Sequence, residues 1–222
     1  MSQTSAILLF SQSSSVEESS KWSEQSRVSV AISSQLISGA ENLCRRSGLD
    51  YFRSDETTQL GDDFGQKLAH AIADIFARGY RHLIVVGNDC PGLRASDLRK
   101  CKKKLQQGQQ VLGPDQRGGV YLLGLQAHAF DPAVFAGLPW QQPSLYTSLV
   151  ALYPDGQSLR SLRDINDHSD LRRSLFVLHG FRCWTVLLSL FAEISTSRPV
   201  FLSWTSAGRD QALLRRGPPV LA

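Results

Sequence analysis

Short apolar runs alternate along the chain with segments of helical periodicity, and this alternation constrains the fold more than any other feature. Residues 6–10 (Ala-Ile-Leu-Leu-Phe) and 82–87 (His-Leu-Ile-Val-Val-Gly) contain almost no polar side chains. Such a run is typical of a strand that is buried on both faces, as in a parallel sheet. Similar runs at residues 49–52, 110–114 and 120–125 predict further strands.

Between these runs, hydrophobic residues recur about every three to four positions, as on one face of a helix. The spacing predicts helices over residues 28–47, 62–78 and 95–107, the first two ending at Gly48 and Gly79. Strands that alternate with helices of this length indicate βαβ units and an α/β layered fold. We therefore look for a site at the carboxyl ends of the strands, where open α/β sheets bind their ligands.

The composition is that of an ordinary globular domain. The chain has 222 residues, of which 42% are hydrophobic and 20% charged, and this is enough for a sizeable core. Its 17 Gly and 9 Pro exclude the collagen-like and wholly disordered classes. A formal net charge of +4 allows phosphate or nucleic-acid partners but requires neither.

Cysteine usage and the hydrophobic profile predict a cytoplasmic protein. The four cysteines, at positions 44, 90, 101 and 183, form no CxxC pair and no zinc-spaced cluster. Scattered thiols fit a reducing compartment better than a secreted disulfide scaffold. The N-terminus lacks the basic region of a signal sequence. The longest nearly apolar stretch, residues 183–192, is shorter than the roughly 20 residues that span a bilayer, so no membrane span is expected.

The first candidate site is Asn88-Asp89-Cys90-Pro91, at the end of the strongest predicted strand. An aspartate in this position, followed by a turn that proline stiffens, is suited to hold Mg²⁺ or Mn²⁺ against phosphate oxygens. The competing interpretation is that Asp89 caps the following turn or helix. The local sequence does not separate the two.

Two further polar segments follow predicted strands. In residues 113–119 (Gly-Pro-Asp-Gln-Arg-Gly-Gly), the paired glycines allow close approach to an anion, but the local sequence slightly favours a plain hairpin turn. Residues 163–170 (Arg-Asp-Ile-Asn-Asp-His-Ser-Asp) are either part of a site or the start of a short helix from about residue 171. In the second case Asp167 or Ser169 would be the cap, with Asp170 in the first turn.

Taken together and in order, the polar segments and their surroundings follow the pattern of one family. The matching blocks are residues 59–68 with 76–79, Gly87 to Pro91, 111–114 with 118–125, Phe135 to Trp140, and Asp164 to Leu171. This order, over about residues 6–178, resembles the GT-A-type family of predicted glycosyltransferases that includes those assigned to arsenosugar biosynthesis. The chain is more distantly similar to small nucleotidyltransferases such as molybdenum-cofactor guanylyltransferase and phospholactate guanylyltransferase.

The resemblance implies a three-layer nucleotide-diphospho-sugar transferase fold with a central mixed, mostly parallel sheet. It implies a metal-dependent glycosyltransferase that uses a nucleotide-sugar donor and an acceptor that it does not identify. Asp89 and Asn166 would hold the divalent cation, Mg²⁺ or Mn²⁺, and Asp89 and Asp164 would be the catalytic residues. The residues that it places at the substrates are Asn88, Pro114, Arg117, Gly118, Gly119, Tyr121 and Trp140.

Two positions depart from the family pattern. The usual first loop, a phosphate grip that contains Lys and Arg, is replaced by residues 11–15 (Ser-Gln-Ser-Ser-Ser), and the next cations along the chain are Lys21 and Arg27. This removes several charge-assisted hydrogen bonds to phosphate, each worth about 1.5–3 kcal/mol. Arg117 stands where many members have an acidic residue, and it either contacts an anionic ligand or marks lost catalysis. Because of these departures, two alternatives to a glycosyltransferase stay open. One is a GT-A-like domain that binds a ligand or partner without turnover, and the other is a nucleotidyltransferase.

The histidines and the basic residues carry weaker signals. His70 and His82 are interpreted as structural, whereas His128 and His168 are expected nearer the site. A basic stretch, which includes residues 99–104, lies on one predicted helix without interleaved aromatic residues. We therefore expect a solvated helix face and no nucleic-acid partner.

The chain divides into two parts. Residues 1–178 are expected to form the transferase-like domain, and residues 179–222 an apolar C-terminal extension that is partly disordered at its end. We interpret the extension as a helix that packs on the domain. A homodimer contact is the next alternative, and a membrane-surface helix the last.

Overall fold

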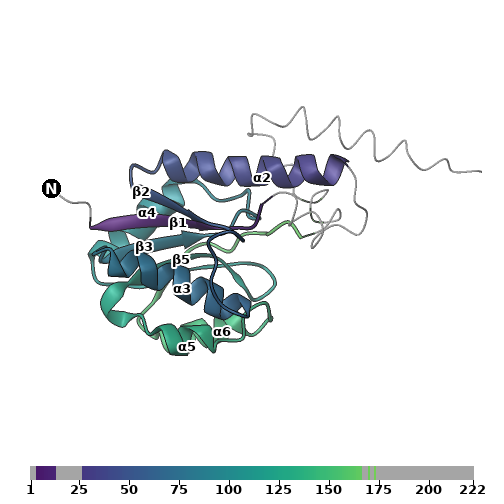
Figure 1. Ribbon diagram of the computed structural model, residues 1–222. Helices are drawn as coiled ribbons and strands as arrows, with labels where there is room; N and C mark the ends of the chain where they lie inside the picture. The colour runs from purple at the N-terminus through teal and green to yellow at the C-terminus, as the bar shows by residue number, and fades with distance from the viewer. Residues whose placement is uncertain (1–3, 14–26, 167–169, 171–172, 174–222) are drawn as a thin grey trace, which may run out of the picture.

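The computed structural model describes residues 4–13, 27–166, 170 and 173 (Figure 1). Strands and helices alternate through the first half of the chain, as the hydrophobic periodicity predicts. In chain order the elements are β1 (Ser5–Phe10), α2 (Arg27–Arg45), β2 (Asp50–Ser54), α3 (Phe64–Ala77), β3 (His82–Val86), α4 (Ala95–Gln106), β4 (Val111–Pro114), β5 (Val120–Gln126), the 3-10 turn η1 (Ala127–Ala129), α5 (Pro132–Ala136), α6 (Leu145–Leu152) and β6 (Gln157–Ser158).

Six strands form one sheet in the order β2-β1-β3-β5-β4-β6. β1 pairs in parallel with β2 and β3, and β4 pairs in parallel with β6. In the described part of the chain, β5 is the strand that runs antiparallel to its neighbours, β3 and β4. The sheet is therefore mixed and mostly parallel, which confirms the predicted fold class.

Helices cover both faces of the sheet (Figure 1). Along β1, Ala6 and Leu8 pack in one core cluster with residues of α3, α5 and α6, whereas Ile7 and Leu9 pack in a second cluster with residues of α2 and α4. β3 alternates in the same way. Because both faces are buried, the strands need no polar positions, and each enclosed Leu or Ile contributes about 1.5–3 kcal/mol. This accounts for the unbroken apolar runs in the sequence.

The strand directions decide which loops meet. The carboxyl ends of β1 and β3 lie at one edge of the sheet, and the turn between β4 and β5 lies at the same edge because β5 runs in the opposite direction. His128, in η1, directly follows β5, whose last residue Gln126 pairs with His82 at the start of β3. The expectation that His128 lies near the site is therefore wrong, since it lies at the opposite edge of the sheet.

Several predictions concern residues that the structure does not describe. These are the helix caps Asp167 and Ser169, the placement of His168, the helix from about residue 171, and the extension 179–222. Among the described helices, none is both long and apolar enough to cross a membrane.

Candidate functional site

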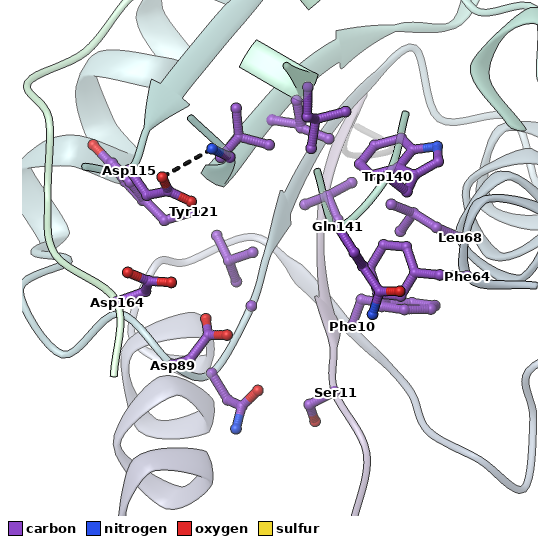
Figure 2. A pocket seen from close by; sticks show the side chains of 18 of the residues that line it. Phe10, Ser11, Phe64, Leu68, Asp89, Asp115, Tyr121, Trp140, Gln141 and Asp164 are labelled. Atoms are coloured by element: carbon purple, nitrogen blue, oxygen red, sulfur yellow. Dashed lines mark hydrogen bonds between the residues drawn. The ribbon is translucent and has the colours of Figure 1, made fainter. Parts of the chain in front are cut away.

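A pocket of about 880 Å³ lies at the carboxyl ends of β1 and β3. Its volume is within the range of about 300–1,000 Å³ that is common for small-molecule sites. Residues that follow β1, β2 and β3 line it, together with the β4–β5 hairpin and the segments 140–145 and 164–166. Asp89, Asp115 and Asp164 line one end of the pocket, and Phe10, Phe64 and Trp140 line the other (Figure 2).

Three carboxylates gather at the acidic end. Asp89 follows β3, Asp115 follows β4, and Asp164 comes from the segment after β6 (Figure 2). Burial raises the pKa of Asp164, and the negative charges of Asp89 and Asp115 raise it further, although a hydrogen bond from Asn166 acts in the opposite direction. The fold therefore holds like charges close together in a partly buried position, as functional sites often do.

Asp164 has one oxygen that the described residues leave unsatisfied. Its Oδ2 accepts a hydrogen bond of 2.5 Å from the side-chain amide of Asn166. Its Oδ1 is buried and has no hydrogen-bond partner among the described residues. Because a buried polar atom without a partner is unfavourable, this oxygen is suited to receive a cation or the proton of a hydroxyl group.

The main chain fixes Asp164 opposite Asp89. The N–H of Ile165 donates a hydrogen bond of 2.8 Å to the carbonyl oxygen of Asp89, and the thiol of Cys90 donates one of 3.5 Å to the carbonyl oxygen of Arg163. Cys90 is buried, and burial raises the pKa of its thiol strongly. Cys90 therefore serves packing, because a buried thiol with a raised pKa is a poor nucleophile.

Arg160 ties the segment that leads to Asp164 to helix α4. Its guanidinium forms two hydrogen bonds with the buried carboxylate of Asp97 in α4, and a third, of 2.7 Å, with the carbonyl oxygen of Gly92. The hydroxyl of Tyr121 donates to the carbonyl oxygen of Arg160 at 2.9 Å. α4 itself begins after Arg94, so Asp89 does not cap this helix.

The Gly-Gly segment is a hairpin turn that also orients Asp115. Asp115 Oδ1 accepts hydrogen bonds from the N–H groups of Arg117 (2.6 Å) and Gly119 (2.9 Å). A Cβ on Gly119 would lie 2.3 Å from Asp115 Oδ2, and one on Gly118 would lie 2.0 Å from the carbonyl oxygen of Pro143. Gly118 also has a φ of +89°. A side chain at either position would therefore clash, at Gly119 with Asp115 and at Gly118 with Pro143.

Arg117 links this hairpin to the segment that carries Asn166. Its guanidinium forms an ion pair with Asp170, whose side chain is 1% exposed. The same carboxylate accepts a hydrogen bond of 3.2 Å from the N–H of Asn166. Arg117 therefore stabilises one side of the pocket, in addition to lining it.

Most of the predicted site residues line this one pocket. They are Asn88, Asp89, Arg117, Gly119, Tyr121, Trp140, Asp164 and Asn166. Pro114 and Gly118 are not among the lining residues: Pro114 ends β4 at an irregularity in its pairing, and Gly118 packs on Pro143. The chain brings the others together from segments far apart in the sequence.

Asp115 is not among the predicted site residues, and neither are four residues at the opposite end of the pocket, Phe10, Phe64, Leu68 and Gln141. Asp115 follows a strand directly, so the rule that identified Asp89 would also have found it. Phe10 and Phe64 carry no such signal, because each also fits the apolar pattern of its strand or helix. Gln141 has no sequence signal at all.

The acidic end has the ligand atoms that a hard divalent cation prefers. In the described part of the chain, no three Asp, Glu, His or Cys side chains form a metal site by themselves. Asp89, Asp164 and Asn166 nevertheless line the same pocket with oxygen-bearing side chains, and Asp164 Oδ1 is buried without a partner among the described residues. Mg²⁺ commonly binds one or two carboxylates and takes its other ligands from substrate phosphates and water. The residues therefore fit Mg²⁺ or Mn²⁺ that binds together with a phosphorylated ligand.

Solved structures share this architecture. The chain is similar to a protein from Desulfovibrio desulfuricans G20 described as a "putative nucleotide-diphospho-sugar transferase", with a TM-score of 0.74, 18% sequence identity, and coverage of 88% of this chain and 98% of that one. This similarity shows that the chain has the nucleotide-diphospho-sugar transferase fold. At this identity it shows the fold alone.

Weaker similarities involve two other proteins. One is Rv0371c of Mycobacterium tuberculosis H37Rv in complex with manganese, with a TM-score of 0.48, 13% identity, and coverage of 78% of this chain and 97% of that one. The other is a cytidylyltransferase from Leptospira borgpetersenii serovar Hardjo-bovis, with a TM-score of 0.42, 10% identity, and coverage of 88% and 95%. No curated protein sequence matches the chain significantly.

A sequence-family model matches residues 24–142, more than half of the chain, and includes Asp89 and the β4–β5 hairpin. The family is described as "Uncharacterized protein conserved in bacteria (DUF2064)". The chain therefore belongs to the DUF2064 family.

Proposed function

We propose that this protein is a metal-dependent glycosyltransferase that uses a nucleotide-sugar donor. The observation that carries the proposal is the convergence of Asp89 and Asp164, with an unsatisfied Asp164 oxygen, at one end of a large pocket. Asp89, at the carboxyl end of β3, suits a cation that binds with a diphosphate, and Asp164 lines the same pocket with an oxygen that the described residues leave free for a proton. The fold shared with the Desulfovibrio protein agrees with this class of donor.

Asp89 and Asn166 would hold Mg²⁺ or Mn²⁺ through their side-chain oxygens. The bound cation would neutralise the charge that develops on the departing diphosphate. Asn88 and Gly119 line the pocket beside these residues and would border the donor. Hydrogen bonds from the main chain around Ile165 keep the two strand-end segments together, so the ligand atoms are positioned before the donor binds.

In the transfer step, the bond between the anomeric carbon and the diphosphate oxygen breaks, and both electrons leave with the nucleoside diphosphate. A hydroxyl oxygen of the acceptor forms the new bond to that carbon. We assign the hydroxyl proton to Asp164 Oδ1, which has no partner among the described residues. The hydrogen bond from Asn166 to Oδ2 orients this carboxylate and leaves Oδ1 directed at the proton of the acceptor hydroxyl.

A second candidate function, ligand binding without turnover, is favoured by the lack of cations in the first loop. Phe10, Ser11 and Gln12 line the pocket where a phosphate grip would be expected, and the basic residues of the described lining are Lys67 and Arg117. Arg117 is already paired with Asp170. Phosphate binding would then depend mainly on the cation and on main-chain N–H groups.

Two variants test the proposal. Binding of UDP, GDP, CDP and ADP is measured by calorimetry with and without Mn²⁺, and Mn²⁺ itself by electron paramagnetic resonance. We expect Asp89→Asn to weaken metal-dependent nucleotide binding about tenfold or more, because a charged ligand is lost. Asp164→Asn should leave nucleotide binding within a few-fold and slow transfer, or hydrolysis of the nucleotide sugar, about 10²- to 10⁴-fold. Asp74→Asn, on the exposed face of α3, is the control.

Each outcome has a distinct meaning. If no nucleotide binds with or without Mn²⁺, the proposal is wrong. If a nucleotide binds but no nucleotide sugar is consumed, the protein binds without turnover. Release of pyrophosphate from a nucleoside triphosphate would instead identify a nucleotidyltransferase that uses the same metal site.

A further inference from the structure

The end of the pocket opposite the carboxylates is built from aromatic rings. Phe10 and Phe64 meet edge to face, with ring centroids 5.5 Å apart and planes at 80°, and Phe64 and Trp140 lie 5.6 Å apart with planes at 44°. Leu68 and Gln141 lie beside them (Figure 2). We call this group, Phe10, Phe64, Leu68, Trp140 and Gln141, the aromatic end.

The aromatic end is held rigidly. The indole N–H of Trp140 donates a hydrogen bond of 2.8 Å to the carbonyl oxygen of Phe135, which fixes the ring. Helix α3 packs so closely on it that a Cβ on Gly65 would lie 2.6 Å from Trp140 Cδ1 and 2.3 Å from the carbonyl oxygen of Ala136. The apolar surface is thus formed before any ligand arrives.

Gln141, which lines the pocket, has an unusual backbone conformation. Its φ is +61°, and among the described residues other than glycine it is the one with a positive φ. Its side chain is exposed, so burial of that side chain does not compensate for the unfavourable conformation. The conformation directs the carboxamide into the space beside Phe64 and Phe10 (Figure 2). Unfavourable backbone conformations that persist in a pocket often serve binding.

The charged residues of the lining favour ligands of different charge at the two ends of the pocket. The described lining contains five carboxylates, Asp62, Asp63, Asp89, Asp115 and Asp164, against two cations, Lys67 and Arg117, a formal balance of −3. A cation at Asp89 offsets this excess only at the acidic end. Asp62 and Asp63 directly precede Phe64 and Lys67 follows it by one turn of α3, so the formal charge beside the aromatic end is −1, which favours a neutral ligand over an anionic one.

The chemistry of the aromatic end fits a ring that bears hydroxyl groups. A carboxamide both donates and accepts hydrogen bonds, as a hydroxyl group does, and carboxylates accept from hydroxyl groups. An apolar ring face can cover Phe64, which offers apolar surface at little entropic cost. The rings stand at 44° and 80° to one another, so they form no parallel pair that would enclose a flat base on both sides.

We propose that the aromatic end is the acceptor subsite and that the acceptor is a neutral sugar ring or glycoside, packed on Phe64 and hydrogen-bonded by Gln141. This rests on the proposed function, because it names the class of acceptor for that transfer. The donor diphosphate then belongs at the acidic end beside Asp89, and the reacting hydroxyl of the acceptor extends from the aromatic end toward Asp164.

The test compares uncharged ligands by saturation-transfer NMR titration. The probes are methyl glucopyranoside, methyl galactopyranoside and methyl mannopyranoside, against uridine, cytidine, guanosine and adenosine, each with and without UDP and Mn²⁺. We expect at least one glycoside to bind, and Phe64→Leu and Gln141→Gly each to weaken it about three- to tenfold. Glycine adopts a positive φ readily, so Gln141→Gly removes the carboxamide and keeps the backbone.

Controls and contrary outcomes separate this inference from the proposed function. Gln116→Ala, in the hairpin and outside the lining, should leave glycoside binding without metal unchanged. The inference is overturned if no glycoside binds, if neither variant at the aromatic end weakens binding, or if these variants abolish binding of a nucleoside instead. Nucleotide binding with Mn²⁺ tests the proposed function independently. The glycoside titration without metal contains neither the nucleotide nor Mn²⁺, so its outcome does not depend on that function.

Discussion

Arg160 holds the carboxylate of Asp97 through two hydrogen bonds, 3.2 Å from Nε to Oδ1 and 2.8 Å from Nη2 to Oδ2. Asp97 is buried in the first turn of α4, and its Oδ2 also accepts from the N–H of Arg94. Because Arg160 belongs to the segment that leads to Asp164, the pair anchors one half of the acidic end to the rest of the domain.

Replacing Arg160 by Leu should lower both stability and metal affinity. The variant leaves Asp97 charged and buried, with the N–H of Arg94 as its remaining partner, at a cost of about 1–3 kcal/mol. The Arg160 side chain is 42% exposed, so solvent screening places the loss toward the lower end of this range. Urea unfolding and Mn²⁺ binding measure the two effects. Arg99→Leu, on the exposed face of the same helix, is the matched control, and equal effects of the two variants would contradict the prediction.

His82 should make the protein less stable as the pH falls below about 6.5. Its ring pairs with the hydroxyl of Ser5 (Nδ1 to Oγ, 3.2 Å), and burial, together with the charges of Arg81 and His128, lowers its pKa. Between the lowered pKa of the folded state and the ordinary pKa of the unfolded chain, the unfolded state binds more protons, so acid favours unfolding there. Below the folded-state pKa this contribution becomes constant.

The comparison between wild type and His82→Gln isolates this effect. The free energy of unfolding from urea titrations, measured between about pH 7.5 and pH 5.5, should fall more steeply in the wild type. The carboxylates of the pocket titrate in both proteins and cancel in the difference. Parallel pH profiles would show that His82 does not contribute.

Gly124→Ala should destabilise the sheet through a clash with α4. A Cβ at this position in β5 would lie 2.6 Å from Cys101 Sγ and 2.9 Å from Val111 Cβ, all within the buried core. Overpacking of this kind costs about 1–3 kcal/mol. Gly137→Ala is the control, because its nearest atoms would be 3.6 Å away. Adding Cys101→Ala to Gly124→Ala should restore part of the loss, and the lack of any restoration would place the strain elsewhere.

The strands were predictable because burial alone explains them. The runs at residues 6–10 and 82–87 are apolar on both faces, and the sheet is covered on both faces. Strand direction was not predictable in the same way. The apolar pattern of β5 reads the same in either direction, and only its pairing with β3 shows that His128 lies at the opposite edge from Asp89.

The two ends of the pocket differ in how far the sequence reveals them. A carboxylate directly after an apolar strand stands out, and this rule identifies Asp89 and would identify Asp115. Phe64 has an equally good explanation as a core residue of α3, so its sequence position does not indicate a ligand. The positive φ of Gln141 has no signal either, since glutamine, unlike glycine or asparagine, is not selected for that conformation.

β6 has only two residues, Gln157–Ser158, and it is the outermost strand of the sheet beside β4. The chain that continues from it carries Asp164, whereas Asp89 follows the central strand β3. Short edge elements open at a lower free energy than the centre of a sheet. Opening at β6 would separate Asp164 from Asp89 only if the hydrogen bond from the N–H of Ile165 to the carbonyl oxygen of Asp89 also broke. A ligand bound between these carboxylates would oppose that opening and so stabilise this edge of the sheet.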